Sequence, residues 1–177
     1  MKTLGEKMLA RVRDFPQAKS SWHGPAQPHE EAIYRLEEEA EGFRLCGEFV
    51  DADKLSVQAL RLQVAAAQAP EAIAFDARRL RHQAEEIVRR ASYLTEKLEL
   101  VELDQNNGKA QIRSSAPRRE PHGTSYFEIV LMGNRELSIC RYEYAEHAAS
   151  RQPVSFVIAQ EMIERLVNDF IAVLSMR

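Results

Sequence analysis

The sequence has few of the residues that build disulfide frameworks or glycine-rich loops. It holds two cysteines and seven glycines in 177 residues. Two cysteines, Cys46 and Cys140, are too few for a disulfide framework and favour a reducing compartment. The glycines form neither a Gly-x-Gly-x-x-Gly nor a Walker pattern, which argues against nucleotide chemistry of those classes.

Long apolar runs are also missing. The run Val64–Ala67 is four residues long and Gln68 ends it, whereas a membrane-spanning helix needs roughly 18 apolar residues. No apolar segment with a small-residue cleavage site follows Met1 and Lys2, so we expect no signal peptide. These absences predict a cytoplasmic protein without membrane association.

Excess charge of either sign is absent as well. The formal net charge is -3 and the isoelectric point is about 6.0, which argues against a general nucleic-acid binder. The composition is 45% hydrophobic and 29% charged, as in globular proteins. At this length we expect one domain over residues 1–177.

Motifs for metal binding and nucleophilic catalysis are missing too. The five histidines and two cysteines show no Cys-x-x-Cys, His-x-x-x-His or His-Glu-x-x-His spacing, and we predict neither a metal site nor a cofactor. No Gly-x-Ser-x-Gly elbow occurs. An enzyme of unknown class remains a hypothesis, with its catalytic residues drawn from distant loops (His122, His147 and Cys140).

Residues 1–50 show the weakest pattern, and we interpret them as a poorly defined helical region. A short helix over Leu4–Val12 would end at Phe15 and Pro16. A second helix is expected over residues 29–43, because its apolar residues recur at steps of three and four. The acidic run 37–39 would lie on its solvated side.

The clearest helical periodicity lies between residues 51 and 98. Apolar residues step by four and three in two segments, 55–69 and 73–98, which is a heptad stripe. In the second segment alanine alternates with larger residues, so we expect a close-packed helical neighbour. The larger residues are Ile73, Leu80, Ile87 and Leu94, and the alanines are Ala77, Ala84 and Ala91.

Pro70 falls between these two heptad segments. Proline inside a helix removes a hydrogen bond and clashes with the preceding turn. The chain would therefore either kink there as one long helix or turn there into a helical hairpin. We favour the hairpin, because a rod of this length would exceed one small domain.

From residue 99 onward the apolar period changes from about 3.6 to two. Leu100–Asp104 alternates, and Asn107-Gly108 is a strong hairpin signal. With these two residues as the turn, Leu103 would face Ile112 and Glu102 would face Arg113. The sequence therefore predicts a first antiparallel strand pair here.

Further strands and a last helix follow. Tyr126–Met132 and Glu136–Tyr144 are rich in strand formers and are separated by Gly133-Asn134, a second hairpin signal. Val154–Ile158 is a candidate fifth strand. A wide apolar stripe from Met162 to Leu174 predicts an amphipathic helix.

The fold class expected from these patterns is α+β. It would combine N-terminal helices with a heptad-patterned helical hairpin or kinked long helix, an antiparallel meander of four to five strands, and a C-terminal amphipathic helix. Residues 99–177 would hold the sheet and the last helix.

Arginines and tyrosines gather on the predicted sheet. The two-residue turn at 133–134 would place Tyr126 opposite Arg141, on the same face as Val130 and Leu137. Arginine and tyrosine side chains on one sheet face could bind an anion, a peptide or a single strand of nucleic acid. The candidate ligand-binding residues are Arg113, Tyr126, Arg141, Tyr142 and Tyr144.

Three functional hypotheses follow. The first is a non-enzymatic protein-interaction or assembly module, self-associating as a homo-oligomer, and it rests on the heptad stripe and the missing catalytic motifs. The second is a binding protein for a small anionic or regulatory ligand on the arginine-tyrosine face. The third is the enzyme described above. The sequence identifies no protein partner.

Overall fold

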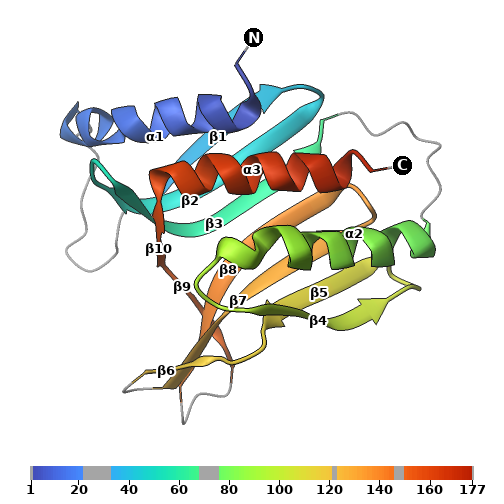
Figure 1. Cartoon of the computed structure of the whole chain (residues 1–177). Coiled ribbons are helices and arrows are strands. Elements are labelled where there is room, and N and C mark those ends of the chain that lie inside the picture. The colour runs from blue at the N-terminus through green and yellow to red at the C-terminus, as the bar shows by residue number, and fades with distance from the viewer. Residues whose placement is uncertain (1, 22–32, 68–75, 121–122, 146–149, 177) are drawn as a thin grey trace.

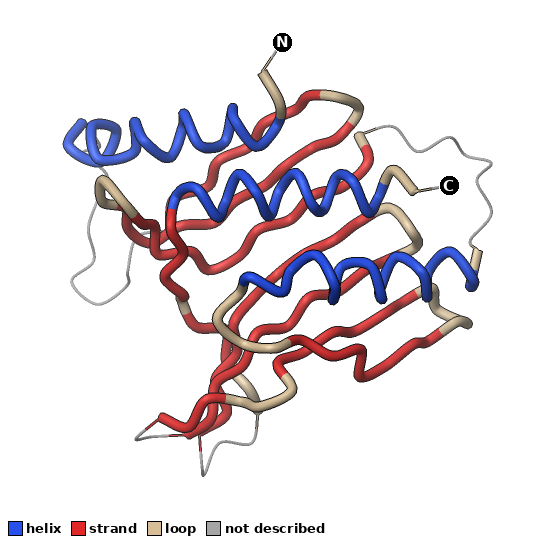
Figure 2. Tube along the Cα trace, in the orientation of Figure 1, coloured by secondary structure: helices blue, strands red, loops and turns tan. Residues whose placement is uncertain are grey.

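An antiparallel sheet of ten strands forms one layer of the protein, and three helices cover one of its faces (Figures 1 and 2). The computed structural model describes residues 2–21, 33–67, 76–120, 123–145 and 150–176. The helices are α1 (Leu4–Ser21), α2 (Ala77–Arg90) and α3 (Gln160–Leu174), with a short 3₁₀ helix at Ala91–Tyr93. The opposite face of the sheet, called the open face below, carries no helix in the described part of the chain.

The strands enter the sheet as two meanders that meet in its centre. The first is β1 (Tyr34–Ala40), β2 (Phe43–Ala52) and β3 (Ser56–Ala66); the second is β4 (Leu98–Asp104), β5 (Lys109–Ser114), β7 (Gly123–Met132) and β8 (Glu136–Ala145). The spatial order is β1-β2-β3-β8-β7-β5-β4. Each meander follows a helix, α1 or α2, so the two halves of the chain have similar layouts. The β3–β8 pairing joins them.

Three short strands complete the sheet. β6 (Arg118–Glu120) pairs with β7, β9 (Gln152–Val154) with β8, and β10 (Phe156–Ala159) with β3. β3 therefore pairs with β8 over Arg61–Ala65 and with β10 over Ser56–Ala59. β10 leads directly into α3, which places that helix over the centre of the sheet (Figure 1).

The hydrophobic core fills the space between the sheet and the helices. Leu62, Ile139 and Ile129 from the central strands and Phe170 from α3 are fully buried in it. A buried polar network also ties three elements together, because Gln83 of α2 donates to the carbonyl of Val173 in α3 (3.0 Å). Asn134, in the β7–β8 turn, donates to the side chain of Gln83 (2.9 Å). Because these buried amide groups are hydrogen-bonded, their burial costs little free energy, and they fix α2 and α3 over the sheet.

The helical prediction for residues 1–50 is wrong beyond α1. A capping box starts α1, since Glu6 N–H donates to Thr3 Oγ1 and Thr3 N–H to the Glu6 carboxylate. The helix continues past Pro16 to Ser21. Residues 34–52, expected to be helical in part, form the β1–β2 hairpin. Its turn residues Glu41 and Gly42 both have positive φ, as a tight two-residue hairpin turn requires.

The heptad prediction for residues 51–98 is also wrong. Ser56–Ala66 is strand β3, and only Ala77–Arg90 forms an α-helix. The buried residues of α2 match the predicted stripe at Leu80, Ala84 and Ile87, but they pack on the sheet and on α3 rather than in a helical hairpin. The described residues contain no coiled coil. Pro70 lies outside the described residues, so its kink or turn has no structural account.

The strand and helix predictions after residue 99 agree with the structure in position, but the predicted register of the first hairpin is wrong. Leu103 pairs with Ala110 and Glu102 with Gln111, because residues 105–108 rather than 107–108 form the turn. β4, β7, β8 and α3 occupy the expected segments, and the fifth strand is divided into β9 and β10 at Ser155. The expected size is wrong, because the sheet has ten strands rather than four or five. Among the described residues no helix is long and apolar enough to cross a membrane.

Candidate functional site

The predicted site residues divide between the two faces of the sheet. The turn between β7 and β8 is one residue longer than predicted, so Tyr126 lies opposite Tyr142 and Phe127 lies opposite Arg141. A one-residue slip turns side chains to the other face. Tyr126, Tyr142 and Tyr144 are therefore on the open face, while Arg141 points to the helix side.

Arg141 is part of the packing between the sheet and the helices. Its guanidinium pairs with Glu96 at 2.8 Å and donates to Ser125 Oγ at 2.8 Å. It also lies over the ring of Phe127, 4.7 Å from its centre. Both charged side chains are nearly buried. Arg141 therefore cannot join Arg113 in one binding site.

Arg113, Tyr126 and Tyr142 do come together on the open face, around a carboxylate that sequence reasoning missed. Glu128 is buried, and its Oε2 accepts hydrogen bonds from Gln111 Nε2 (2.6 Å), Arg113 Nε (2.7 Å) and Arg151 Nη1 (2.5 Å). We call this group the Glu128 cluster; its members are Gln111, Arg113, Tyr126, Glu128, Tyr142 and Arg151.

Cation-π stacking holds the same cluster together. The Arg151 guanidinium lies 4.1 Å from the ring centre of Tyr142, and the Arg113 guanidinium 5.4 Å from that of Tyr126. The two rings are 6.2 Å apart. Two guanidinium groups share one carboxylate here, so the cluster keeps a net positive charge. Tyr144 follows Tyr142 by two residues on β8, on the same face, and is half exposed.

A shallow cavity of about 260 Å³, the β8 trough, runs along β8 beside this cluster. Its wall along β8 is made by four alternate residues, Glu136, Ser138, Cys140 and Tyr142. Arg61 of β3 lies directly opposite Cys140 and lines the same cavity. Glu136 thus lies near one end of the trough, across Met132 from Lys109, and Arg61 lies near the other end, where Glu128 is the register partner of Cys140 on β7.

Arg61 is the most unusual member of the trough. Its Nε is buried and has no hydrogen-bond partner in the described part of the chain. A buried donor without a partner is uncommon in folded proteins. Its register neighbours are Glu48 on β2 and Cys140 on β8, and no ion pair within 4.0 Å joins Arg61 to a described carboxylate. The sequence pattern of residues 56–66 gave no indication that Arg61 would line a cavity without a partner.

The thiol of Cys140 is poorly suited to nucleophilic chemistry. Burial raises its pKa above the usual value, although the nearby positive charge of Arg61 acts in the opposite direction. The thiol is therefore protonated at neutral pH, whereas an activated cysteine needs a lowered pKa. Burial likewise raises the pKa of Tyr142. His122 and His147 lie outside the described residues.

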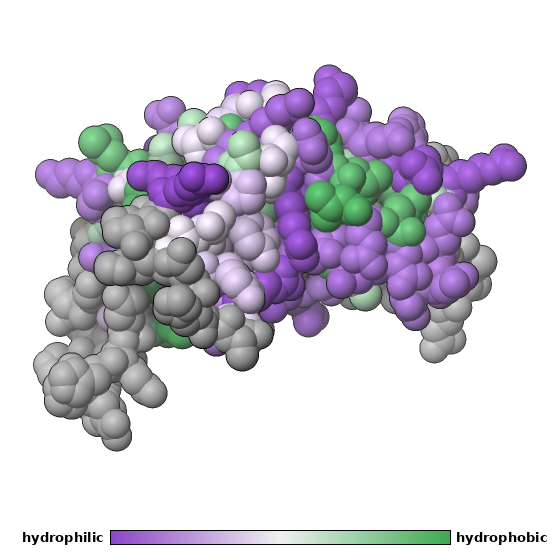
Figure 3. Space-filling view, turned by 90° about the horizontal axis from the view of Figure 1, so that it is seen from below, coloured by the Kyte–Doolittle hydropathy of each residue, from purple (hydrophilic) through white to green (hydrophobic). Residues whose placement is uncertain are grey.

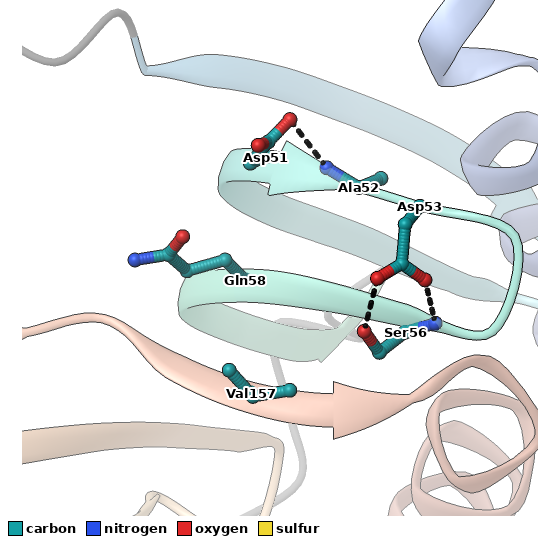
Figure 4. A pocket seen from close by; sticks show the side chains of 6 residues that line it. All are labelled: Asp51, Ala52, Asp53, Ser56, Gln58 and Val157. Carbon is teal, nitrogen blue, oxygen red and sulfur yellow. Dashed lines mark hydrogen bonds between the residues drawn. The ribbon is translucent and has the colours of Figure 1, made fainter.

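A second, acidic cavity lies at the β2–β3 turn and is lined by Asp51, Asp53, Ser56, Gln58 and Val157 among others (Figure 4). The Asp53 carboxylate accepts hydrogen bonds from the backbone N–H groups of Leu55 and Ser56 and from Ser56 Oγ. These bonds lower the pKa of Asp53. The carboxylate is thus used to hold the turn, and no group of three or more potential metal ligands occurs in the described residues.

Hydrophobic surface also occurs away from the trough. Figure 3 looks onto the side that carries α2 and β4 and shows a hydrophobic patch in a mostly hydrophilic surface. β4 is an edge strand and carries the half-exposed Val101. A separate apolar cavity of about 180 Å³ lies beside β10, with Leu94, Phe127, Phe156 and Met162 in its lining.

Comparison of the chain with protein-family models, curated proteins and solved structures finds no match. The function is therefore inferred from the geometry of the open face.

Proposed function

We propose that this is a non-enzymatic binding protein that holds an acidic group of its ligand in the β8 trough, between Arg61 and Arg151. The observation that carries the proposal is the side chain of Arg61, which lines the trough without a hydrogen bond or ion pair to a described residue. A carboxylate or phosphate oxygen would supply that partner, because a guanidinium group presents several donors in the fork geometry that such oxygens fit.

The charge balance of the trough supports an acidic ligand. Arg61, Lys109 and Arg151 line it together with two carboxylates, Glu128 and Glu136. Glu128 already accepts hydrogen bonds from Arg113 and Arg151. Its single negative charge therefore cannot also neutralise Arg61. Glu48 lies opposite Arg61 on β2, so Arg61, Arg113 and Arg151 are balanced by two carboxylates, Glu48 and Glu128, and one excess positive charge remains near the Arg61 end for an incoming anion.

Isothermal titration calorimetry tests this proposal with citrate and inorganic phosphate as probes, at low ionic strength. We expect binding that weakens with added salt and at least a tenfold loss of affinity in Arg61→Gln. Arg44→Gln is the matched control, because Arg44 is exposed on β2 and pairs with Glu39 at 3.7 Å, outside the trough. Absence of binding of either anion, or equal affinity in Arg61→Gln and the native protein, would refute the proposal.

A protein-interaction role is the second candidate, and a different observation now favours it. The heptad stripe no longer supports self-association, because its first segment is a strand. The apolar cavity beside β10 is bordered instead by Val157, 71% exposed, and Met162, 36% exposed. Light scattering with mass resolution separates the possibilities; a strict monomer at high concentration would remove the self-associating form of this role.

A further inference from the structure

We infer that the ligand of the β8 trough is a short free peptide of about four residues, bound in an extended conformation. Its terminal carboxylate would lie at Arg61 and its terminal ammonium at Glu136. The inference rests on the proposed function, and adds the ligand class and its orientation.

Two charged side chains of opposite sign, Arg61 and Glu136, lie near opposite ends of the trough without a partner in the described part of the chain, while Glu128 near Arg61 is already paired. Arg61, near one end, has a buried donor without a partner. Glu136, at the other end, lines the same cavity, and no hydrogen bond or ion pair holds its carboxylate within the described part of the chain. A ligand that is negative at one end and positive at the other complements both groups, and a peptide with free termini has that distribution at neutral pH.

The distance between the two ends sets the length of the peptide. Arg61 lies directly opposite Cys140, and Cys140 follows Glu136 by four residues on the same strand. At about 3.3 Å per residue, the two positions are roughly 13 Å apart along β8. An extended peptide advances by the same amount per residue, so about four residues span the trough.

The middle of the trough suits a peptide backbone. Between the two ends the cavity is lined by the small Ser138 of β8 and by Val130, its register partner on β7. Neither side chain is charged, and Ser138 offers a hydroxyl that can donate or accept a hydrogen bond. Lys109 lines the cavity at the Glu136 end, across Met132 from Glu136, and adds a donor for a carbonyl oxygen there.

Glu136 argues against a ligand that is acidic throughout. A dicarboxylate long enough to span the trough would bring its second negative charge to the Glu136 carboxylate, and like charges at close range are unfavourable. The same repulsion would oppose a nucleic-acid backbone. A small anion can occupy the Arg61 end, but it leaves Glu136 without a partner.

Calorimetric titration of alanine peptides tests the inference. We would compare two to six residues at pH 6.5, where the terminal amine is charged, and expect the highest affinity at three to five. N-acetylation of tetra-alanine should weaken binding at least fivefold in the native protein and have no effect in Glu136→Gln. C-terminal amidation should weaken it similarly in the native protein and have no effect in Arg61→Gln.

The pair Glu39 and Arg44 provides matched controls, because both lie on the open face outside the trough and pair with each other. Glu39→Gln and Arg44→Gln should respond to acetylation and amidation as the native protein does. Equal affinity for free and acetylated peptides, or an affinity that does not depend on peptide length, would overturn the inference. If citrate still bound in an Arg61-dependent way, the proposed function would stand. Loss of binding of citrate and peptides alike would overturn both.

Discussion

At the scale of single residues, Glu128 organises the open face, and its removal tests that role. Glu128→Gln keeps the shape of the side chain and removes the charge that Arg113 and Arg151 share. Hydrogen bonds to a buried charged group contribute more than neutral ones, so we expect the free energy of unfolding to fall by about 1–3 kcal/mol. Urea denaturation at pH 7 measures this change.

Glu99→Gln is the control for that experiment. Glu99 lies opposite Arg113 in the sheet register, but it is 52% exposed and its ion pair with Lys97 is 3.6 Å long. Exposed ion pairs contribute little, so this variant should differ from the native protein by less than about 0.5 kcal/mol. Equal losses in both variants would contradict a special role for Glu128.

Part of the candidate site could be predicted at this scale. The sequence proposed Arg113, Tyr126 and Tyr142 for one arginine-tyrosine face, and these three side chains do lie together, although the predicted register would have placed Tyr142 and Tyr126 on opposite faces. Arg141 was assigned to that face because a two-residue turn was assumed, whereas Met132 pairs with Glu136 across three turn residues. Gly133 and Asn134 both have positive φ, and sequence alone does not say whether a third residue joins such a turn. Glu128 was missed because no local pattern marks a carboxylate whose partners come from other strands.

At the scale of elements, the contact between α1 and α3 depends on Gly5. A Cβ atom at this position would lie 2.8 Å from Asn168 Oδ1 and 2.8 Å from the Glu164 carbonyl oxygen. Alanine favours a helix over glycine by about 1 kcal/mol, so an open site would gain stability. Here we expect Gly5→Ala to lower the free energy of unfolding by about 1–3 kcal/mol instead, as overpacked sites do.

Combining Gly5→Ala with Asn168→Ala separates the two clashes, because the backbone contact with Glu164 remains. The double variant should recover part of the lost stability in urea denaturation, but not all of it. An unchanged or increased stability of Gly5→Ala alone would show that the two helices separate without cost.

The link between α2 and α3 predicts a pH dependence. Hydrogen bonds from Arg89 and Arg90 lower the pKa of Glu86 from 4.5 to about 2, and Arg90 also pairs with Asp169 of α3. A carboxyl group whose pKa is lower in the folded state stabilises the protein above its unfolded pKa and loses that effect as the pH falls through the folded pKa. Glu86→Gln should therefore lower the urea midpoint at pH 7, with the deficit shrinking between pH 4.5 and 2.

Glu85→Gln provides the comparison for this pH series, since Glu85 is 59% exposed and lies 4.0 Å from Arg81. Its urea midpoint should follow that of the native protein at every pH. A deficit of Glu86→Gln that persisted unchanged at pH 2 would mean that the variant disturbs packing rather than charge.

The error over residues 55–69 has a physical cause within one element. The buried residues of β3 are Val57, Ala59, Leu62 and Val64, a period of two broken by one step of three. That step falls where the β2–β3 register shifts, between the Ala59–Phe49 and Arg61–Glu48 pairs. A β-bulge adds one residue and changes the face of those that follow. The step of three from Ala59 to Leu62 therefore coincides with a helical spacing, whereas Leu55, the first residue of the predicted stripe, is 81% exposed before β3 begins. α3 has no such interruption and was predicted correctly.

At the scale of the whole molecule, the sheet is made by two meanders that run from its edges to its centre. β1 and β4 form the two edges, and the β3–β8 pair closes the sheet. Leu62 and Ile139, opposite each other in that pair, are more than 70 residues apart in the chain. Local periodicity carries no information about such a pairing, which explains why strands were predicted and the ten-stranded sheet was not.

This arrangement predicts a gradient of hydrogen exchange across the sheet. Amides that are buried and paired on both sides open only with the whole fold, whereas edges open locally. We expect the slowest exchange in β3, β8 and β7 and the fastest strand exchange in Tyr34–Ala40 and Leu98–Asp104, measured by mass spectrometry at pH 7 in increasing urea. Loss of protection of α1, β1, β2 and β3 together, while α2 and its meander stay protected, would contradict a single cooperative sheet. Because the trough takes Arg61 from one meander and Glu136 from the other, separate opening of the halves would also dismantle the proposed binding site.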